Sequence, residues 1–280
     1  WLADLCAREG IAFVLGHALY MKAIHGAKAK SDRIDSEKIA ILVRGGLMPV
    51  AYAYPADMRA TRDLMRRRLL FVRQRGSLLA HIQITHHQYN VDPPGKRITY
   101  RSNREGLGEG FEDPSVRHSI AADLALADHY EVTIGELELA VLRQARIHDP
   151  NALALLTSVP GIGKVLALTI LYEIHDIARF PSVRDFASYS RLVKCERSSA
   201  GKSLGSGGNK IGNAYLKWAF SEAAVLFIAK SEQGRTVLTR LERKYGKPKA
   251  LSVLAHKLGR AVYYMLARKQ AFDPQRFATS

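Results

Sequence analysis

Short apolar runs and one amphipathic segment alternate near the start of the chain. The runs IAFVLG at 11–16 and PVAYAYP at 49–55 are rich in β-forming residues. Runs of this length and composition predict buried strands of the parallel kind. Between them, DSEKIAILVRGG at 35–46 predicts a helix that ends at two glycines. Strand, helix and strand in this order indicate an α/β domain, which we place at residues 1–60.

Two long helical patterns follow this domain. Residues 57–89 are helical and strongly basic, and residues 119–147 place leucines among acidic side chains. The intervening residues 90–118 contain prolines and glycines and predict a loop. Two long helices joined by a polar tip form a helical hairpin or coiled coil, which we place at 61–149.

The pattern from Pro150 to the end is helical except in one segment. That segment, CERSSAGKSLGSGGNKIGN at 195–213, is rich in serine, glycine and lysine and predicts a loop. Residues 150–280 therefore form a mainly helical C-terminal domain, and the fold class is α/β plus all-α. Its helices are expected at 185–193, 214–230, 234–244 and 249–270.

The net charge of the chain indicates which class of partner it binds. A formal net charge of +16 indicates a polyanionic partner, and nucleic acid before a membrane surface. No apolar run approaches the ~20 residues of a membrane span, so no membrane partner is expected. The only cysteines, Cys6 and Cys195, lack metal-ligand spacing and indicate a reducing compartment, so we expect a cytoplasmic protein.

One acidic pair has the spacing of a metal site. In KAKSDRIDSEKIA at 28–40, Asp32 and Asp35 are three residues apart and share one face of a helix. Two such carboxylates are the hard oxygen ligands that Mg²⁺ prefers. The alternative is a structural role, with Asp32 as the N-cap and Asp35 interacting with the helix dipole.

A glycine turn between two apolar helices gives a second candidate. LLTSVPGIGKVLALTILYEI at 155–174 has the pattern of a helix–hairpin–helix motif. Its glycines allow backbone amides to face a phosphate, and the next helix adds a favourable dipole. An ordinary tight turn is the alternative, but the basic charge favours nucleic-acid contact. The residues concerned are Pro160, Gly161, Gly163 and Lys164.

The serine-rich segment allows three interpretations. AGKS at 200–203 matches the end of a phosphate-binding P-loop, but that motif needs glycine where Glu196 stands, which excludes it. A flexible linker is compatible with the composition. A loop that presents a nucleophilic serine is the third, because serine needs nearby cations or a metal to attack a phosphodiester. The available cations are Arg197, Lys202 and Lys210.

A dense basic run lies on the helix after the α/β segment. A solvated helix face is the usual explanation of such a run, but here few acidic residues accompany it, which favours contact with a nucleic-acid backbone. The run comprises Arg66, Arg67, Arg68, Arg73 and Arg75.

Two segments together resemble one family over nearly the whole chain. Residues 17–55 resemble the part of the DEDD, RuvC-like domain that holds the third and fourth acidic positions in insertion sequence 110 family transposases. Residues 159–224 are similar to the C-terminal transposase domain of that family. The resemblance implies a partial RuvC/RNase H-like domain before the helical hairpin.

The resemblance also implies an activity. Family members are site-specific DNA recombinases of bacterial mobile elements, guided by a structured bridge RNA that pairs with donor and target DNA. They act as homo-oligomers, a dimer or tetramer, bind Mg²⁺ at four acidic positions, and form a 5′-phosphoserine intermediate. By motif, Asp32 and Asp35 match two acidic positions, and Ser199 matches the nucleophile, with Ser198 as the alternative.

The chain departs from the family pattern at two places. Its loop reads Ser198-Ser199-Ala200 where the family has Ser-Ser-Gly, and alanine tolerates left-handed backbone poorly. The family's first Asp and its Glu precede anything in the chain, which starts at Trp1. We therefore expect an N-terminally truncated transposase that holds two of the four ligands and is inactive alone.

Three other functions are compatible with the sequence. A non-catalytic DNA- or RNA-binding remnant has the same charge and the same glycine turn. A metal-dependent RuvC-like nuclease would need Asp32 and Asp35 but not Ser199. In the third, the long hairpin is only a dimerisation arm. A covalent adduct with DNA that depends on Ser199 distinguishes the recombinase from all three.

Overall fold

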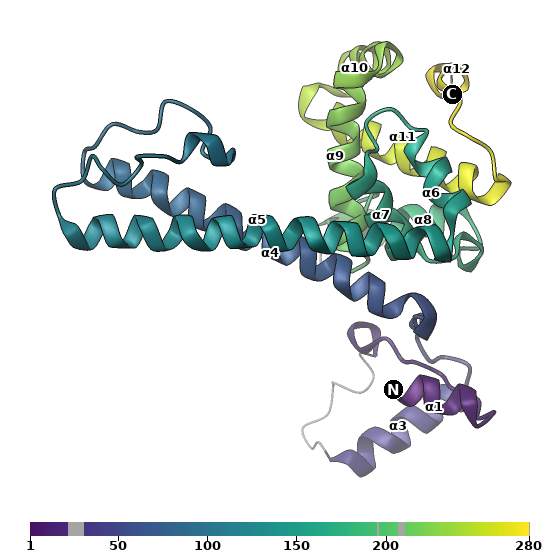
Figure 1. Ribbon diagram of the computed structural model, residues 1–280. Helices are drawn as coiled ribbons and strands as arrows, with labels where there is room; N and C mark the ends of the chain where they lie inside the picture. Colours follow the sequence, from purple (N-terminus) through teal and green to yellow (C-terminus); the bar gives the residue numbers. More distant parts are fainter. Residues whose placement is uncertain (22–30, 195, 207–210, 280) are drawn as a thin grey trace. The chain divides into compact units, whose positions relative to one another are not determined.

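The computed structural model describes residues 1–21, 31–194, 196–206 and 211–279 (Figure 1). These residues are mostly helical, and they divide into two compact units. Unit 1 consists of Trp1–Arg59 with Lys194–Gly212, and unit 2 of Ala60–Val193 with Asn213–Ser280. Each unit is described separately. No helix in the described ranges has both the length and the apolar character to cross a membrane.

Unit 1 contains α1 (Leu2–Arg8), a 3₁₀ turn η1 (Ala18–Tyr20) and α3 (Asp32–Arg44). The helix expected at 35–46 is confirmed, but it begins earlier, because the Ser31 hydroxyl accepts a hydrogen bond from the Ile34 amide at 3.3 Å. Arg59, near the start of α4, pairs with Asp4 of α1 at 2.7 Å. The pKa of Asp4 is lowered by this hydrogen bond.

The two expected strands of unit 1 form only one bridge. Gly16 pairs with Val50 in the antiparallel sense, and the Ala51 amide donates to the Leu15 carbonyl at 2.7 Å. The prediction of buried parallel strands is therefore wrong for these segments, and Val50 is 69% exposed. Among the described residues, no further strand pairs with these two segments, and two strands alone form only marginal pairing. The RuvC-like α/β domain stays a prediction.

The two long helices of the hairpin are confirmed in unit 2. Helix α4 (Ala56–Gln88) and helix α5 (Pro114–His148) run antiparallel, as Figure 1 shows. The contacts between them fit antiparallel helices, because the later residue of α4 meets the earlier residue of α5. The ring centroids of Phe71 and Tyr130 lie 5.4 Å apart, and the His81 Nδ1 lies 2.6 Å from the Asp123 Oδ2. Helix α5 begins before residue 119 because Asp113 caps it and Pro114 occupies its first turn.

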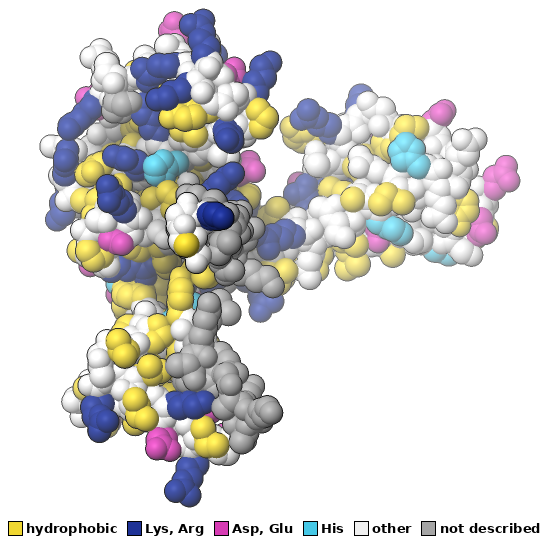
Figure 2. All heavy atoms as spheres, turned by 180° about the vertical axis from the view of Figure 1, so that it is seen from behind, with side chains coloured by type: hydrophobic (Ala, Val, Ile, Leu, Met, Phe, Trp, Pro, Cys, Tyr) yellow, Lys and Arg dark blue, Asp and Glu magenta, His cyan; other side chains and the backbone are white. Residues whose placement is uncertain are grey.

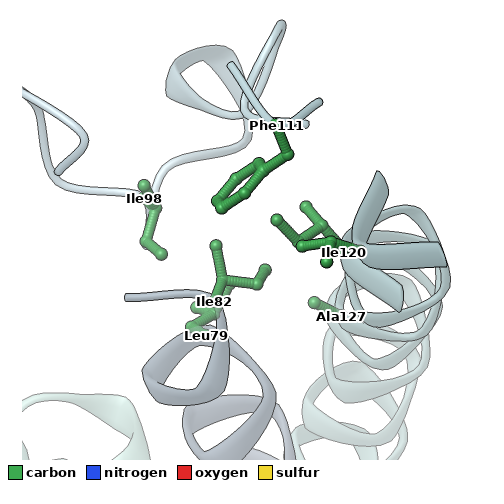
Figure 3. Close-up of a cluster of buried hydrophobic side chains, with 7 residues drawn as sticks. Leu79, Ile82, Ile98, Phe111, Ile120 and Ala127 are labelled. Atoms are coloured by element: carbon green, nitrogen blue, oxygen red, sulfur yellow. The ribbon is translucent and has the colours of Figure 1, made fainter. Parts of the chain in front are cut away.

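The tip of the hairpin is not only polar. Its linker, which includes the 3₁₀ turn η2 (Arg101–Asn103), places Ile98 and Phe111 between the two helices. Figure 3 shows both side chains directed toward Ile82 of α4 and Ile120 of α5. The prolines and glycines predicted a loop correctly, but its scattered apolar residues close a small core of their own.

The remaining helices of unit 2 pack around α7. Residues Leu166–Ile174 of α7 are all buried, and Phe220 and Phe227 of α9 and Leu258 of α11 contribute further fully buried side chains. The predicted helices at 185–193, 214–230, 234–244 and 249–270 are confirmed, with shifted ends. The elements are α6 (Pro150–Thr157), α7 (Lys164–Ile174), η3 (Ile177–Arg179), α8 (Val183–Tyr189), α9 (Ala214–Lys230), α10 (Glu232–Tyr245), α11 (Lys247–Arg268) and α12 (Pro274–Thr279).

Candidate nucleic-acid interface

Residues 196–206 of the serine-rich segment form a β-hairpin. Strand β1 (Glu196–Ser199) pairs antiparallel with β2 (Lys202–Ser206), and Ala200 and Gly201 form the two-residue turn. Both turn residues have positive φ, 49° at Ala200 and 76° at Gly201. This is the combination that a type I′ turn requires, and it matches the twist of paired strands. The prediction of an irregular loop is therefore wrong.

The turn places Ser199 in an exposed position opposite Lys202. These two residues are partners in the strand register, and both are exposed. Residues directly opposite in an antiparallel pair lie on the same face, with their Cβ atoms about 4.5–5.5 Å apart. The hairpin therefore brings a hydroxyl and an ammonium group to one face beside the turn.

Ala200 adopts the backbone that glycine favours. A left-handed conformation costs an L-residue about 1–2 kcal/mol. The strand pairing on both sides of the turn holds Ala200 in this region, so the difference from the Ser-Ser-Gly pattern does not prevent the turn.

Two further predicted residues of this segment, Arg197 and Ser198, lie in β1. Ser198 pairs through its backbone with Ser203. Lys210 and Cys195 lie outside the described residues.

Asp32 and Asp35 lie in the first turn of α3. Asp32 is exposed and Asp35 is partly buried. The alternative in which Asp32 is the N-cap is wrong, because Ser31 caps the helix. Within the described ranges, no three His, Cys, Asp or Glu side chains gather in a group that could hold a metal. The two carboxylates are three residues apart in this turn, a spacing that makes helical side chains neighbours.

The glycine turn between α6 and α7 has two distinct halves. Gly161 is buried with φ +93°, and a Cβ atom there would lie 2.5 Å from the Phe227 backbone nitrogen of α9. Gly161 is therefore required for the close approach of the turn to α9. Gly163 and Lys164 are exposed at the start of α7, while Pro160 is partly buried. Only this second half is accessible to a phosphate.

In the basic run on α4, some arginines form ion pairs with carboxylates and others face solvent. Arg66 bonds to Glu173 of α7 at 2.6 Å, and Arg68 bonds to Glu138 of α5 at 2.5 Å. Arg67 is exposed, with its guanidinium 6.0 Å from the Phe71 ring. Of the three consecutive arginines, Arg67 is therefore the one whose charge faces solvent rather than a carboxylate.

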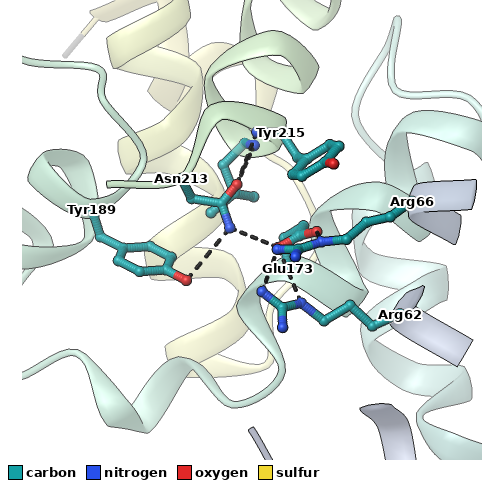
Figure 4. Close-up of polar contacts among 7 residues, drawn as sticks. Arg62, Arg66, Glu173, Tyr189, Asn213 and Tyr215 are labelled. Carbon is teal, nitrogen blue, oxygen red and sulfur yellow. Dashed lines mark hydrogen bonds and ion pairs between the residues drawn. The ribbon is translucent and has the colours of Figure 1, made fainter. Parts of the chain in front are cut away.

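Glu173 is the centre of a buried polar network (Figure 4). Its side chain is 3% exposed and accepts hydrogen bonds from Arg62 at 3.1 Å and Arg66 at 2.6 Å. Asn213 donates to it at 2.6 Å, and the same asparagine accepts from the Leu216 amide at 3.0 Å as the N-cap of α9. The network joins α4, α7 and α9 through side chains.

The electrostatics of Glu173 follow from these partners. Burial alone raises the pKa of Glu173, but the hydrogen bonds from Arg66 and Asn213 and the charges of Arg62 and Arg66 outweigh it, so the pKa is lowered. Glu173 therefore stays ionised although it is buried. Sequence analysis did not identify it, yet the signal was present, since Glu173 is the only acidic residue in the apolar helix α7.

The comparisons with known proteins point to one family. Residues 153–238 match the sequence model of the "Transposase IS116/IS110/IS902 family". The chain is 26% identical over 249 residues to the protein y4qE of Sinorhizobium fredii, covering 87% of this chain and 60% of that protein. It is 22% identical to the transposase for insertion sequence element IS1111A of Coxiella burnetii, covering 87% of this chain and 68% of that transposase.

A third relative is the transposase for insertion sequence element IS1328 of Yersinia enterocolitica. It is 26% identical, and the match covers 87% of this chain and 74% of that transposase. The chain thus spans between 60% and 74% of the length of these relatives. The chain is thus similar to transposases of insertion sequence elements.

Proposed function

We propose that the chain is a transposase of the IS116/IS110/IS902 family and that it cuts and rejoins DNA by phosphoryl transfer with Ser199 as the nucleophile. The observation that carries the proposal is the exposed Ser199 opposite Lys202, beside a turn held in the left-handed region. The net charge of +16 supports DNA as the substrate.

The proposed reaction has two steps, each of which exchanges one ester bond at phosphorus for another. In the first, the Ser199 Oγ forms a bond to phosphorus and loses its proton, while the bond from phosphorus to the 3′ oxygen breaks and that oxygen takes up a proton. In the second, the 3′ hydroxyl of another strand loses its proton and its oxygen bonds to phosphorus, while the bond from phosphorus to the Ser199 Oγ breaks and Oγ takes up a proton. Covalent catalysis of this kind retains the phosphodiester energy for rejoining.

Lys202 has an electrostatic role in this scheme. An ammonium group on the same face as the nucleophile attracts the phosphate and stabilises the charge that develops on its oxygens. Exposed Gly163 and Lys164 at the start of α7 and exposed Arg67 supply further candidate contacts to the DNA backbone.

Asp32 and Asp35 would hold Mg²⁺ by their carboxylate oxygens. A bound Mg²⁺ supplies charge stabilisation to the oxygens of a phosphoryl group. A structured guide RNA, donor and target DNA, and a second copy of the chain complete the proposed assembly. The family match and the strongly basic chain support these partners.

The experiment is a covalent trapping assay. The protein is mixed with RNA transcribed from its encoding locus and with labelled DNA that spans the ends of that locus. We expect a labelled band that survives denaturing electrophoresis, that disappears in Ser199→Ala, and that persists in the matched control Ser198→Ala.

Each other outcome identifies another function. Cleavage without an adduct, lost in Asp35→Asn but not in Ser199→Ala, would indicate a metal-dependent nuclease. Retarded DNA or RNA with no cleavage in any variant would indicate a binding protein. An adduct that is lost in Ser198→Ala and kept in Ser199→Ala would move the nucleophile by one residue.

A further inference from the structure

A second basic site lies in unit 2, and it is lined by none of the residues proposed above to contact DNA. A groove of about 930 Å³ opens between α10, α11 and the segment at 270–277. Figure 2 shows Lys and Arg side chains gathered over the end of unit 2 that holds α10 and α12, at the upper left of that view.

The walls of the groove are cationic and lack compensating acids. The exposed arginines and lysine that line it form no ion pair with a carboxylate in the part of the chain that the structure describes. Its one acidic lining residue, Asp273, accepts hydrogen bonds from the Gln275 and Arg276 amides and caps α12. The five exposed cations are Arg240, Lys244, Arg260, Arg268 and Arg276.

The charges of two of these cations contribute, after burial, to lowered pKa values in neighbouring side chains. The pKa of Lys257 is lowered by burial and then by the charge of Arg240. The pKa of His256 is lowered by burial and then by the charge of Arg260. A bound anion would reduce this repulsion, because its negative charge would lie among the positive charges of the arginine and lysine side chains.

Aromatic rings alternate with the cations along the groove. Tyr264 is 37% exposed with the Arg268 guanidinium 4.8 Å from its ring, and Tyr245 is 44% exposed with the Lys244 ammonium 5.3 Å from its ring. Each pair combines a phosphate-binding group with a ring on which a base can stack.

We propose that the groove between α10, α11 and residues 270–277 binds an unpaired nucleic-acid strand. Phosphates contact Arg260 and Arg268, and a base stacks on Tyr264. A duplex keeps its bases paired and stacked inside, so exposed rings in a hollow suit a strand whose bases are free. The proposal rests on the proposed function only in that the chain acts on nucleic acids, and it requires no chemistry at Ser199.

The test is fluorescence anisotropy with the whole chain and labelled oligothymidylate of ~12 nucleotides, an oligouridylate of the same length, and a DNA duplex. We expect Arg260→Gln with Arg268→Gln to weaken single-strand binding by about tenfold or more and to reduce the salt dependence, since the slope follows the number of phosphates contacted. Tyr264→Leu should weaken it at least about fivefold, while Tyr264→Phe keeps the ring and the affinity.

The matched control is Arg143→Gln with Arg146→Gln, which removes the same charge from exposed positions of α5. Equal loss in both double variants, or full binding by Tyr264→Leu, would overturn the proposal, as would tighter binding of the duplex than of either single strand. Comparison of the two oligonucleotides assigns the site to DNA or RNA. Ser199→Ala should bind normally, so failure of the groove and failure of the serine chemistry give different results.

Discussion

The Nδ2 atom of Asn213 donates a hydrogen bond to Oε2 of Glu173 at 2.6 Å. Asn213 also accepts hydrogen bonds from the Tyr215 and Leu216 amides, so one side chain both caps α9 and binds the buried carboxylate of α7. In the chain, Asn213 follows the serine hairpin after a short connection. The start of α9 is thus fixed by a group whose other partners, Arg62 and Arg66, come from α4.

The first prediction is that Glu173→Gln destabilises unit 2. The change leaves Arg62 and Arg66 without the carboxylate that neutralises them at a largely buried site, and breaking a buried pair costs about 3–5 kcal/mol. Urea denaturation followed by circular dichroism measures the loss. The control is Glu138→Gln, which breaks a more exposed pair with Arg68 and should cost about 1 kcal/mol or less. Equal losses would contradict the assigned role of Glu173.

The second prediction concerns acid stability. Hydrogen bonds and charges from its partners hold the pKa of Glu173 in the folded protein below the ordinary pKa of a glutamate side chain. The folded state therefore binds its proton less readily than the unfolded state, so the stabilisation is complete above the unfolded pKa and is lost as the pH falls through the folded pKa. Unfolding free energies measured from neutral to acid pH should fall less steeply in Glu173→Gln than in the unchanged chain. An identical slope would show that Glu173 contributes nothing to acid unfolding.

The third prediction separates the two glycines of the α6–α7 turn. Gly161→Ala should destabilise unit 2 by about 1–3 kcal/mol or more, because the added Cβ would meet the α9 backbone at 2.5 Å and the φ of +93° is unfavourable for alanine. Gly163→Ala has open space around its Cβ and should change stability by less than about 1 kcal/mol. Thermal unfolding of the two variants makes the comparison. Equal midpoints for Gly161→Ala and the unchanged chain would count against the contact with Phe227.

The fourth prediction concerns the serine hairpin. Ala200→Gly removes the strain of a left-handed alanine, which amounts to about 1 kcal/mol, so the hairpin should open about fivefold less often. Hydrogen exchange of the β1 and β2 amides reports this opening directly. Ala200→Val should have the opposite effect, because a β-branched residue is disfavoured at positive φ. Unchanged exchange in both variants would be inconsistent with the type I′ turn.

Several features could be predicted from local sequence because they depend on neighbouring residues. The helical patterns of residues 57–89 and 214–230 located α4 and α9, since helix formation depends largely on residues within the helix's own length. The start of α5 was placed late although Asp113 and Pro114 form a recognisable capping signal. The hairpin at 196–206 was missed because its residues have weak strand preference, and the pairing depends on a turn with alanine in an unfavourable conformation.

Part of the candidate site could also be predicted from local sequence. The family resemblance predicted Ser199, and the spacing predicted Asp32 and Asp35 as candidates; the structure places Ser199 beside the hairpin turn and the two acids in one helical turn. Sequence patterns could not show which of Arg66, Arg67 and Arg68 pairs with a carboxylate and which faces solvent. Consecutive residues on a helix point in different directions, and the partners of these arginines lie far away in the chain. Nor could sequence patterns show that Gly161 is required by the α9 backbone.

The sequence by itself determined the helices, the basic charge and the short segments with candidate chemistry, because each depends on composition or on contacts within a few residues. Only the tertiary structure decided which charges neutralise one another and which remain available. Arg66 meets Glu173 and Arg68 meets Glu138 across separations of 107 and 70 residues, while Arg260 and Arg268 form no ion pair with a carboxylate among the residues that the structure describes. Such pairings arise when the apolar faces pack and bring distant elements together, and no local pattern encodes them.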